Sequence, residues 1–182
     1  MKKELKRYIL EWAVDIAVAG IIVYIITTFA FQNMYVVGSS MNPTLNNGEA
    51  VLVNKLTYLV KEPSRYDIVA FKHINIANEE INFVKRIIGI SGDKIDIIDG
   101  IIYINDEMLG DPVSEYSKQD IIKAGSMVYP IIVPKDSYFV LGDNKTNSID
   151  SRYQEVGMIP KKEIIGKIIV RIWPLWKFKI FK

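Results

Sequence analysis

The sequence predicts an all-β domain of short, mostly antiparallel strands, a β-barrel or sandwich, behind one N-terminal transmembrane helix. The helix is indicated by an apolar run over residues 12–31, which is long enough to cross a bilayer. The strands are indicated by short segments rich in Ile, Val, Tyr and Phe, which follow residue 31 and are separated by turn residues. Asp99 and Gly100 lie between two such segments and form a strong two-residue hairpin signal.

The composition excludes several kinds of chemistry. The 182 residues carry 23 Lys and Arg against 21 Asp and Glu, a net charge of +2 that does not favour a nucleic-acid partner. Cysteine is absent and His73 is the single histidine, so a structural zinc site of the Cys and His kind is ruled out. We expect neither a metal nor a cofactor. A nucleophile must be a Ser, Thr, Lys or carboxylate side chain, and a histidine base could only be His73.

The N-terminal segment is typical of a retained membrane anchor. Its basic residues are Lys2, Lys3, Lys6 and Arg7. Because basic residues favour the cytoplasmic side, we expect residues 1–11 in the cytoplasm, residues 12–31 as a single span of about 30 Å in the cell membrane, and residues 32–182 outside the cytoplasm. Interfacial Trp12 and Tyr35 would mark the two edges of the span.

A cleaved signal peptide is the competing interpretation of this segment. Thr28 and Ala30 place small residues at the −3 and −1 positions that a cleavage site needs. The length of the apolar run favours the retained anchor instead. N-terminal sequencing of membrane-extracted protein separates the two interpretations, because a mature start at Phe31 would contradict the anchor.

The body of the chain contains one region that differs from the rest. We expect a smaller insert at about residues 93–140, which contains the predicted hairpin. Residues 110–125 are polar and predict a surface excursion, whereas residues 126–133 predict a strand. Short helical turns are expected near Pro43 and Pro160.

The tail "RIWPLWKFKIFK", residues 171–182, mixes aromatic residues with lysines. It is too short and too charged to span a membrane. It suits either a membrane interface or a packed terminal strand, and the sequence leaves both interpretations open.

Three polar segments could carry chemistry. "GSSMNPTL" (residues 38–45) holds two serines on a tight turn, where a hydroxyl and backbone N–H groups can face a substrate carbonyl. "INFVKRIIGISGDKI" (residues 81–95) places Lys85 in an apolar strand, and burial would lower its pKa toward that of a base. "GDNKTNSIDSRY" (residues 142–153) concentrates short donors and acceptors that could orient a catalytic side chain.

Each segment also has an ordinary structural interpretation. The first could be a polar turn, Lys85 could extend its amine to water at a strand end, and the third could be a solvated loop. "SGDK", residues 91–94, fits an S-x-x-K spacing, but it lies in a glycine-containing turn rather than on a helix, so we discount it.

Taken together, the segments resemble those of bacterial type I signal peptidases, membrane-anchored serine proteases that remove signal peptides. The resemblance covers the anchor and nearly all of residues 32–174, and it is closer to the Gram-positive form. The matching stretches are "SSMNPTL", "SRYDIVAF", "VKRIIGISGD", "GDNKTNSIDSR" and the hairpin "DGIIYIND". Any one of them is a moderate signal, but four boxes in the family's order behind one anchor are highly specific.

The resemblance implies roles for individual residues. Ser40, directly before Met41, corresponds to the nucleophile, Lys85 to the general base, and Ser148 to the serine that hydrogen-bonds the amine. Asp150 and Arg86 correspond to a supporting ion pair with Arg152 beside it.

The oxyanion site departs from part of the family. Relatives hold the oxyanion with the backbone N–H of the nucleophile and, in some members, with a serine hydroxyl two residues earlier. That position is Gly38 here, so the hydroxyl is missing. Further departures are Tyr66 for Gly, Lys145 for Arg and Thr146 for Asp.

The resemblance also implies a substrate and partners. Preprotein signal peptides with small side chains at −1 and −3 would lie extended along a strand edge. The pockets would involve Met34, Val36, Leu45, Phe83 and Val84, although these residues could equally be plain core. Membrane lipid is an expected partner, and the secretion translocon is a further candidate.

Three rival functions remain at this point. The first is a Ser–Lys peptidase dedicated to a narrow substrate set, such as pilins or spore-coat proteins. The second is a self-cleaving repressor fold with the same dyad, which the apolar run argues against. The third is a non-catalytic membrane-anchored β-module, which the intact Ser40, Lys85 and Ser148 argue against.

Overall fold

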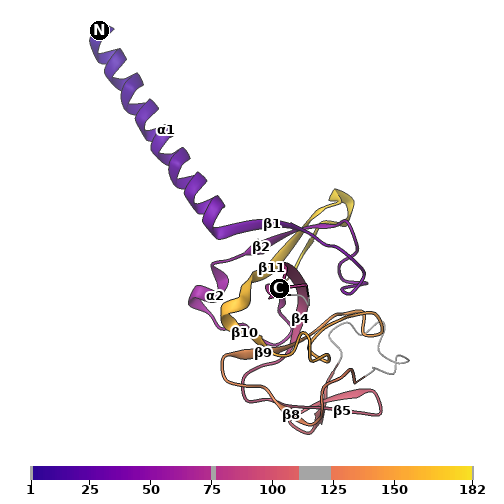
Figure 1. The fold of residues 1–182 in the computed structure, drawn as a ribbon. Helices are drawn as coiled ribbons and strands as arrows, with labels where there is room; N and C mark the ends of the chain where they lie inside the picture. Colours follow the sequence, from indigo (N-terminus) through magenta and orange to yellow (C-terminus); the bar gives the residue numbers. More distant parts are fainter. Residues whose placement is uncertain (1, 75–76, 111–123, 182) are drawn as a thin grey trace.

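The computed structural model describes residues 2–74, 77–110 and 124–181. One long helix, α1 (Lys2–Ala30), projects from a body of β-strands (Figure 1). Every strand pairing in these ranges is antiparallel. The predicted fold class, an all-β body behind an N-terminal apolar helix, is therefore confirmed.

Helix α1 contains the apolar run, although its bounds differ from those expected. Its segment Tyr8–Ala30 is long and apolar enough to cross a membrane, and the described side chains before Ala30 are all exposed. The helix begins at Lys2 rather than near residue 12. It ends at Ala30 because the carbonyl of Ala30 accepts the N–H of Lys55 at 2.8 Å and strand pairing starts at the next residue.

The C-terminal end of helix α1 contains or adjoins three residues that the sequence singled out. Tyr35 does not mark the edge of the helix, because it is the last residue of strand β1. Thr28 and Ala30, the residues of the alternative cleavage site, lie in the last helical turn, and the side chain of Ala30 is buried.

The larger sheet has eight strands. Seven of them lie in the order β1 (Phe31–Tyr35), β2 (Ala50–Asn54), β11 (Ile164–Trp173), β3 (Ile68–Ile74), β4 (Glu80–Gly89), β9 (Ser137–Leu141) and β10 (Ile159–Pro160), and β12 (Lys179–Ile180) pairs with β11. Short helices flank the sheet as α2 (Thr57–Val60), η1 (Lys161–Glu163) and η2 (Leu175–Lys177). Of the two expected helical turns, the one near Pro160 is η1.

The smaller sheet lies within the expected insert. It has the order β7 (Glu107–Met108), β6 (Ile101–Ile104), β5 (Lys94–Ile98) and β8 (Ile131–Ile132). The predicted hairpin is confirmed, because β5 and β6 pair directly and Asp99 and Gly100 both have positive φ. The strand expected over residues 126–133 is wrong for most of its length, since only two residues pair with β5. Residues 111–123 of the expected surface excursion lie outside the described residues.

The core explains why the first four residues of strand β3, residues 68–71, are apolar on both faces. Ile68 and Ala70 belong to one buried cluster, whereas the alternate residues Val69 and Phe71 belong to another. Successive side chains of a strand point to opposite faces, so both faces of the larger sheet are covered here. The first cluster also contains Met41 and Leu45, which attach the turn after β1 to the sheet.

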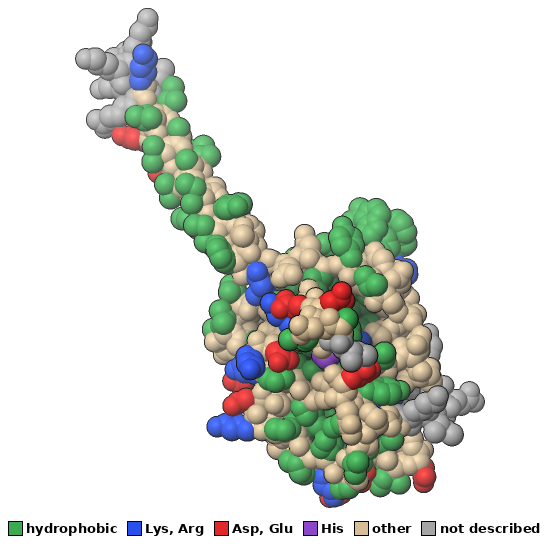
Figure 2. Space-filling view, viewed as in Figure 1, with side chains coloured by type: hydrophobic (Ala, Val, Ile, Leu, Met, Phe, Trp, Pro, Cys, Tyr) green, Lys and Arg blue, Asp and Glu red, His purple; other side chains and the backbone are tan. Residues whose placement is uncertain are grey.

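The C-terminal tail folds back as β12 on β11, so the terminal-strand interpretation is correct for its backbone. Phe181 packs against the first core cluster, but the other aromatic side chains of the tail remain exposed, and apolar atoms gather over this hairpin at the upper right (Figure 2). The exposed residues are Trp173, Leu175, Trp176, Phe178 and Ile180.

Close backbone approach at Gly166 provides a test of the sheet packing. A Cβ at this position would lie 2.3 Å from the carbonyl oxygen of Asn54, which is backbone and has little freedom to move. We expect Gly166→Ala to lower the free energy of unfolding by about 1–3 kcal/mol, as overpacking does. Gly110→Ala is the matched control, because a Cβ there meets nothing within 4 Å. Denaturant unfolding of the detergent-solubilised protein measures both variants, and equal midpoints would contradict the packing.

Candidate active site

The turn after β1 presents Ser40. The N–H of Asn42 donates to the carbonyl of Ser39 at 3.0 Å, and the N–H of Leu45 donates to the carbonyl of Met41 at 2.8 Å. The side chains of Met41 and Leu45 are fully buried, so the turn is attached to the core. Ser40 itself keeps part of its surface exposed, which leaves its hydroxyl accessible.

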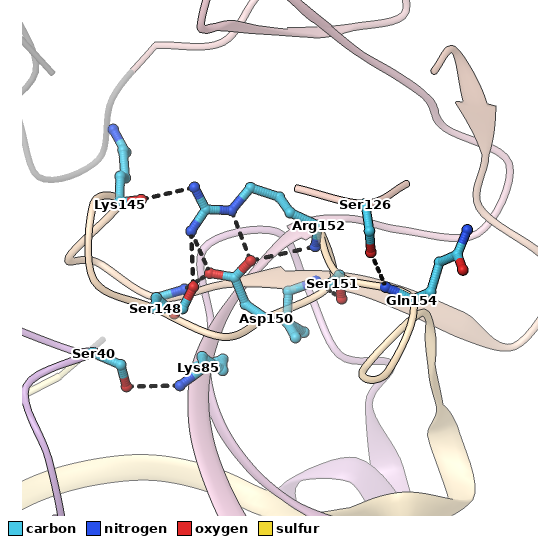
Figure 3. A network of polar contacts seen from close by, with 11 residues as sticks. Ser40, Lys85, Ser126, Lys145, Ser148, Asp150, Ser151, Arg152 and Gln154 are labelled. Atoms are coloured by element: carbon cyan, nitrogen blue, oxygen red, sulfur yellow. Dashed lines mark hydrogen bonds and ion pairs between the residues drawn. The ribbon is translucent and has the colours of Figure 1, made fainter. Parts of the chain in front are cut away.

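Strand β4 brings the amine of Lys85 to this hydroxyl. Nζ of Lys85 lies 2.7 Å from Oγ of Ser40, and the two side chains point toward one another (Figure 3). Lys85 is only 3% exposed, and its Nζ lies 5.0 Å from the ring centroid of Phe83. The alternative of a lysine that reaches water at a strand end is therefore wrong for this residue.

Burial sets the protonation of Lys85. Desolvation by burial lowers the pKa of its amine from 10.5 to about 8, because the charged form loses its hydration. The carboxylates of Asp150 and Asp143 act in the opposite direction, and the guanidinium of Arg152 acts with the burial. A substantial fraction of the amine is therefore neutral near physiological pH.

Asp150 and Arg152 form a buried ion pair that closes the loop over residues 142–150. Both oxygens of Asp150 accept from the guanidinium at 2.8 Å, and the pair is almost wholly buried (Figure 3). Asp150 also accepts the N–H of Gly142 at 3.0 Å. Arg152 donates to the carbonyls of Lys145 at 2.7 Å and Ser148 at 3.3 Å. One ion pair therefore holds the start, middle and end of this loop.

The expected ion pair between Asp150 and Arg86 is wrong. Arg86 instead donates to both oxygens of Asp143, at 2.8 and 2.7 Å, and to the carbonyl of Tyr66 at 2.9 Å. Neighbouring side chains on a strand point to opposite faces, so Arg86 cannot share the side of Lys85. The site thus has two separate ion pairs, one on each side of strand β4.

Ser148 does not form the expected hydrogen bond to Lys85. Its Oγ is buried and has no hydrogen-bond partner among the described residues. The residue is placed by its carbonyl, which accepts from Arg152. The structure therefore holds Ser148 through the ion pair, with its hydroxyl unused.

Two asparagines of the loop contact the serine turn, and sequence reasoning assigned neither of them a specific role. Asn144 donates through Nδ2 to the carbonyl of Ser39 at 3.1 Å, and its N–H donates to the carbonyl of Ser40 at 3.0 Å. Asn147 donates to Oγ of Ser39 at 2.9 Å. Both residues lie in the motif-like stretch "GDNKTNSIDSR", but the sequence does not show what they contact, because their partners are more than 100 positions away.

Gly38 cannot supply an oxyanion donor. Its N–H already donates to Oδ1 of Asn47 at 2.9 Å, and its φ of +87° disfavours any side chain. The backbone N–H of Ser40 makes no hydrogen bond with any described residue.

His73 is not the base of Ser40. It lies further along β3, stacked on Phe83 at 5.2 Å between ring centroids, whereas Lys85 pairs with Val69 of the same strand. In the described ranges, no three His, Asp or Glu side chains are arranged to hold a metal ion.

The five expected substrate positions differ in exposure. Val36 and Leu45 are buried in the first core cluster, and Met34 and Val84 pack against it with part of their surface exposed. Phe83 packs against a different cluster and is also partly exposed.

Comparisons with known proteins show the family of this chain. A family model described as "Signal peptidase, peptidase S26" matches residues 9–173. "Signal peptidase IB" of Staphylococcus aureus is 36% identical over 187 residues, which cover 96% of this chain and 95% of that protein. "Signal peptidase I T" of Bacillus subtilis is 38% identical over 169 residues, with 91% and 85% covered. A crystal structure of a signal peptidase I from Enterococcus faecalis shares 30% identity, covers 59% of this chain and 97% of its own, and has a TM-score of 0.45.

These relatives define the class of protein first: the chain is a serine endopeptidase with one apolar N-terminal helix. More specifically, it belongs to the signal peptidase family S26, and it cleaves signal peptides from exported preproteins.

The buried pair of Asp150 and Arg152 predicts a large loss of stability when one partner is removed. Asp150→Asn removes the buried carboxylate that pairs with the guanidinium of Arg152, and we expect it to cost about 3–5 kcal/mol. The exposed pair of Lys72 and Glu80 is the control, and Glu80→Gln should cost less than about 1 kcal/mol. Unfolding of the full chain in detergent measures both, and a similar loss in the two variants would contradict the role of the buried pair.

Proposed function

We propose that Ser40 is the nucleophile and Lys85 the general base of signal peptide cleavage. The observation that supports this assignment is the 2.7 Å contact between Oγ of Ser40 and a buried amine whose pKa is lowered to about 8. A neutral amine can accept the hydroxyl proton, which is the Ser–Lys variant of serine nucleophile activation.

The proton path follows from this contact. The neutral amine of Lys85 takes the proton of Ser40 as Oγ attacks the scissile carbonyl carbon, and the carbonyl oxygen becomes an oxyanion. The protonated amine then gives that proton to the leaving nitrogen as the peptide bond breaks, which leaves an acyl-enzyme ester. Lys85 next accepts a proton from water as the water oxygen attacks the ester carbonyl, and it returns that proton to Oγ of Ser40 as the ester bond breaks, which releases the acid and restores both residues.

The supporting residues position this pair. The ion pair of Asp150 and Arg152 holds the loop against the serine turn, and Arg86 joins the same loop through Asp143. The buried hydroxyl of Ser148 is available to orient the amine of Lys85 once substrate is bound.

An extended signal peptide fits an open strand edge next to the dyad. β4 pairs with β9 only through Arg86, Ile87 and Gly89, so its first part has no strand partner on that side among the described residues. The cleavage segment adds to this edge by backbone hydrogen bonds and meets Met34, Phe83 and Val84, with Val36 and Leu45 forming the wall beneath. A dedicated peptidase with a narrow substrate set would use the same edge.

We further propose that the catalytic body lies outside the cytoplasm and touches lipid. The basic residues at the start of α1 favour the cytoplasmic side of the membrane. Tyr35 of β1 and Trp173 of β11 both pair with Ala50, so the exposed aromatic hairpin lies beside the end of β1 that leads to Ser40. Aromatic and lysine side chains together are typical of membrane interfaces. The secretion translocon is a candidate partner at this surface.

The pKa of Lys85 predicts the pH dependence of cleavage. Below about pH 8 the amine is protonated and has no lone pair for the serine proton, whereas above it the amine is neutral. We expect kcat/KM to rise with pH and to level off above about pH 8. A profile measured with a purified preprotein and the detergent-solubilised enzyme checks this, and an activity that falls through this range would contradict a lysine base.

Substitution of the dyad tests the assignment directly. We expect Ser40→Ala and Lys85→Ala to abolish preprotein cleavage, whereas Ser91→Ala, an exposed serine of a remote turn, should cleave as the wild type does. Cleavage by the Ser40 or Lys85 variant would refute the dyad, and no cleavage by any form would favour the non-catalytic module.

Lipid contact by the hairpin can be measured through its tryptophans. The chain has three, so Trp12→Phe with Trp173→Phe leaves Trp176, which is 79% exposed, as the single reporter. We expect its fluorescence to be quenched in vesicles that contain lipids brominated near the headgroups. The control replaces all three and adds Met108→Trp on the smaller sheet, away from α1 in Figure 1, where quenching should be absent. Equal quenching at both positions, or none at Trp176, would contradict lipid contact.

A further inference from the structure

The peptide group between Ser39 and Ser40 lies at the centre of the loop contacts. Its carbonyl oxygen, that of Ser39, accepts two hydrogen bonds, one from the N–H of Asn42 at 3.0 Å and one from Nδ2 of Asn144 at 3.1 Å. The N–H of Ser40 on the other side of this group has no partner among the described residues. The carbonyl of this peptide group is thus held by two hydrogen bonds, whereas its N–H has none with the described residues.

Holding the carbonyl also aims the N–H. The peptide is planar and trans, so its C=O and N–H point in opposite directions within one rigid plane. A single hydrogen bond from Asn42 restrains the distance but lets the plane rotate about that bond. The second bond from Asn144, which comes from another part of the chain, removes this rotation.

The backbone of Asn144 strengthens the same arrangement. Its N–H donates to the carbonyl of Ser40 at 3.0 Å, so Asn144 contacts the peptide groups on both sides of the nucleophile. The start of the loop also lies close to the serine turn, since a Cβ at Gly142 would lie only 2.4 Å from the carbonyl oxygen of Ser40.

The direction of this N–H matters more here than in a site with several donors. Gly38 has no hydroxyl, and its own N–H is occupied by Asn47. Oxyanion donors act by being aimed in advance at the position where charge develops, and removal of one donor lowers kcat by about 10²–10³-fold. A small rotation of the Ser39–Ser40 peptide would misdirect the donor that remains.

We propose that Asn144 is a positioning residue for the oxyanion site: its side-chain amide fixes the plane of the Ser39–Ser40 peptide and so aims the N–H of Ser40 at the oxyanion. This inference rests on the proposed dyad. Asn144 does not touch the reacting atoms, and it acts on the transition state rather than on substrate binding or on Lys85.

The first test is the kinetics of two variants that lose the amide donor. Asn144→Ala removes the side chain, and Asn144→Asp keeps its size but replaces the donor with an acceptor; both retain the backbone N–H to Ser40. We expect kcat to fall about 10- to 100-fold, less than for loss of a direct oxyanion donor, with KM little changed. In Asn144→Ala the pH at which kcat/KM levels off should not move. Ser91→Ala is the control, because Ser91 is exposed on the turn after β4 and its hydroxyl donates to the carbonyl of Ser137 rather than to the loop; it should cleave as the wild type does.

The second test measures inhibitor binding at the oxyanion site without turnover. It can also be applied to a variant that is less stable than the wild type. A peptide aldehyde with the sequence before a cleavage site adds Ser40 to its carbonyl and places an oxygen in the oxyanion site, whereas the same peptide ending in an amide binds only in the ground state. We expect aldehyde binding to weaken in both Asn144 variants by about the factor lost in kcat/KM, and amide binding to stay constant.

The outcomes separate this inference from the proposed function. Cleavage by Ser40→Ala would overturn the dyad itself. If Ser40→Ala is inactive and the Asn144 variants match the wild type, the dyad stands and the positioning role is overturned. The role is also overturned if KM rises at constant kcat, if the pH limb of Asn144→Ala moves, or if aldehyde and amide binding weaken equally.

Discussion

The desolvated amine of Lys85 is the constraint on which the rest of the site depends. An amine in water would be charged at neutral pH and could not take a proton from a serine, so the fold must exclude water from it. Strand β4 does so by burying the side chain beside Phe83. The surrounding charges shift the pKa of the amine in opposite directions, because Asp150 and Asp143 raise it while Arg152 lowers it.

This constraint gives the two ion pairs a common purpose. Isolated charges near a buried amine would either protonate it permanently or be too costly to bury, but paired charges have a smaller net effect. The pair of Asp150 and Arg152 also carries the backbone contacts that close the loop, and Arg86 attaches the loop start through Asp143. The same side chains therefore compensate the charges near the amine and hold the loop in place.

The serine turn depends on the loop in return. Met41 and Leu45 attach the turn to the core through their side chains, and the backbone hydrogen bonds from Asn42 and Leu45 hold the turn within itself. The contacts of Asn144 and Asn147 come from the loop that the ion pair closes. Because Gly38 brings no hydroxyl, the proposed mechanism relies on the geometry of one N–H, that of Ser40, to hold the oxyanion.

The sequence alone predicted the fold class, the apolar helix and the hairpin at Asp99 and Gly100, because strand periodicity and turn residues are local properties. The candidate residues Ser40 and Lys85 came from the resemblance of the motifs to those of signal peptidases. It did not determine which charges pair: Arg86 was matched with Asp150, whereas the structure joins it to Asp143. Nor did it single out Asn144, whose importance comes from a contact with Ser39 across 105 positions. Only the tertiary structure decided these points. Ion pairing, burial and the direction of a peptide plane depend on which strands and loops lie side by side, and the local sequence pattern does not specify that arrangement.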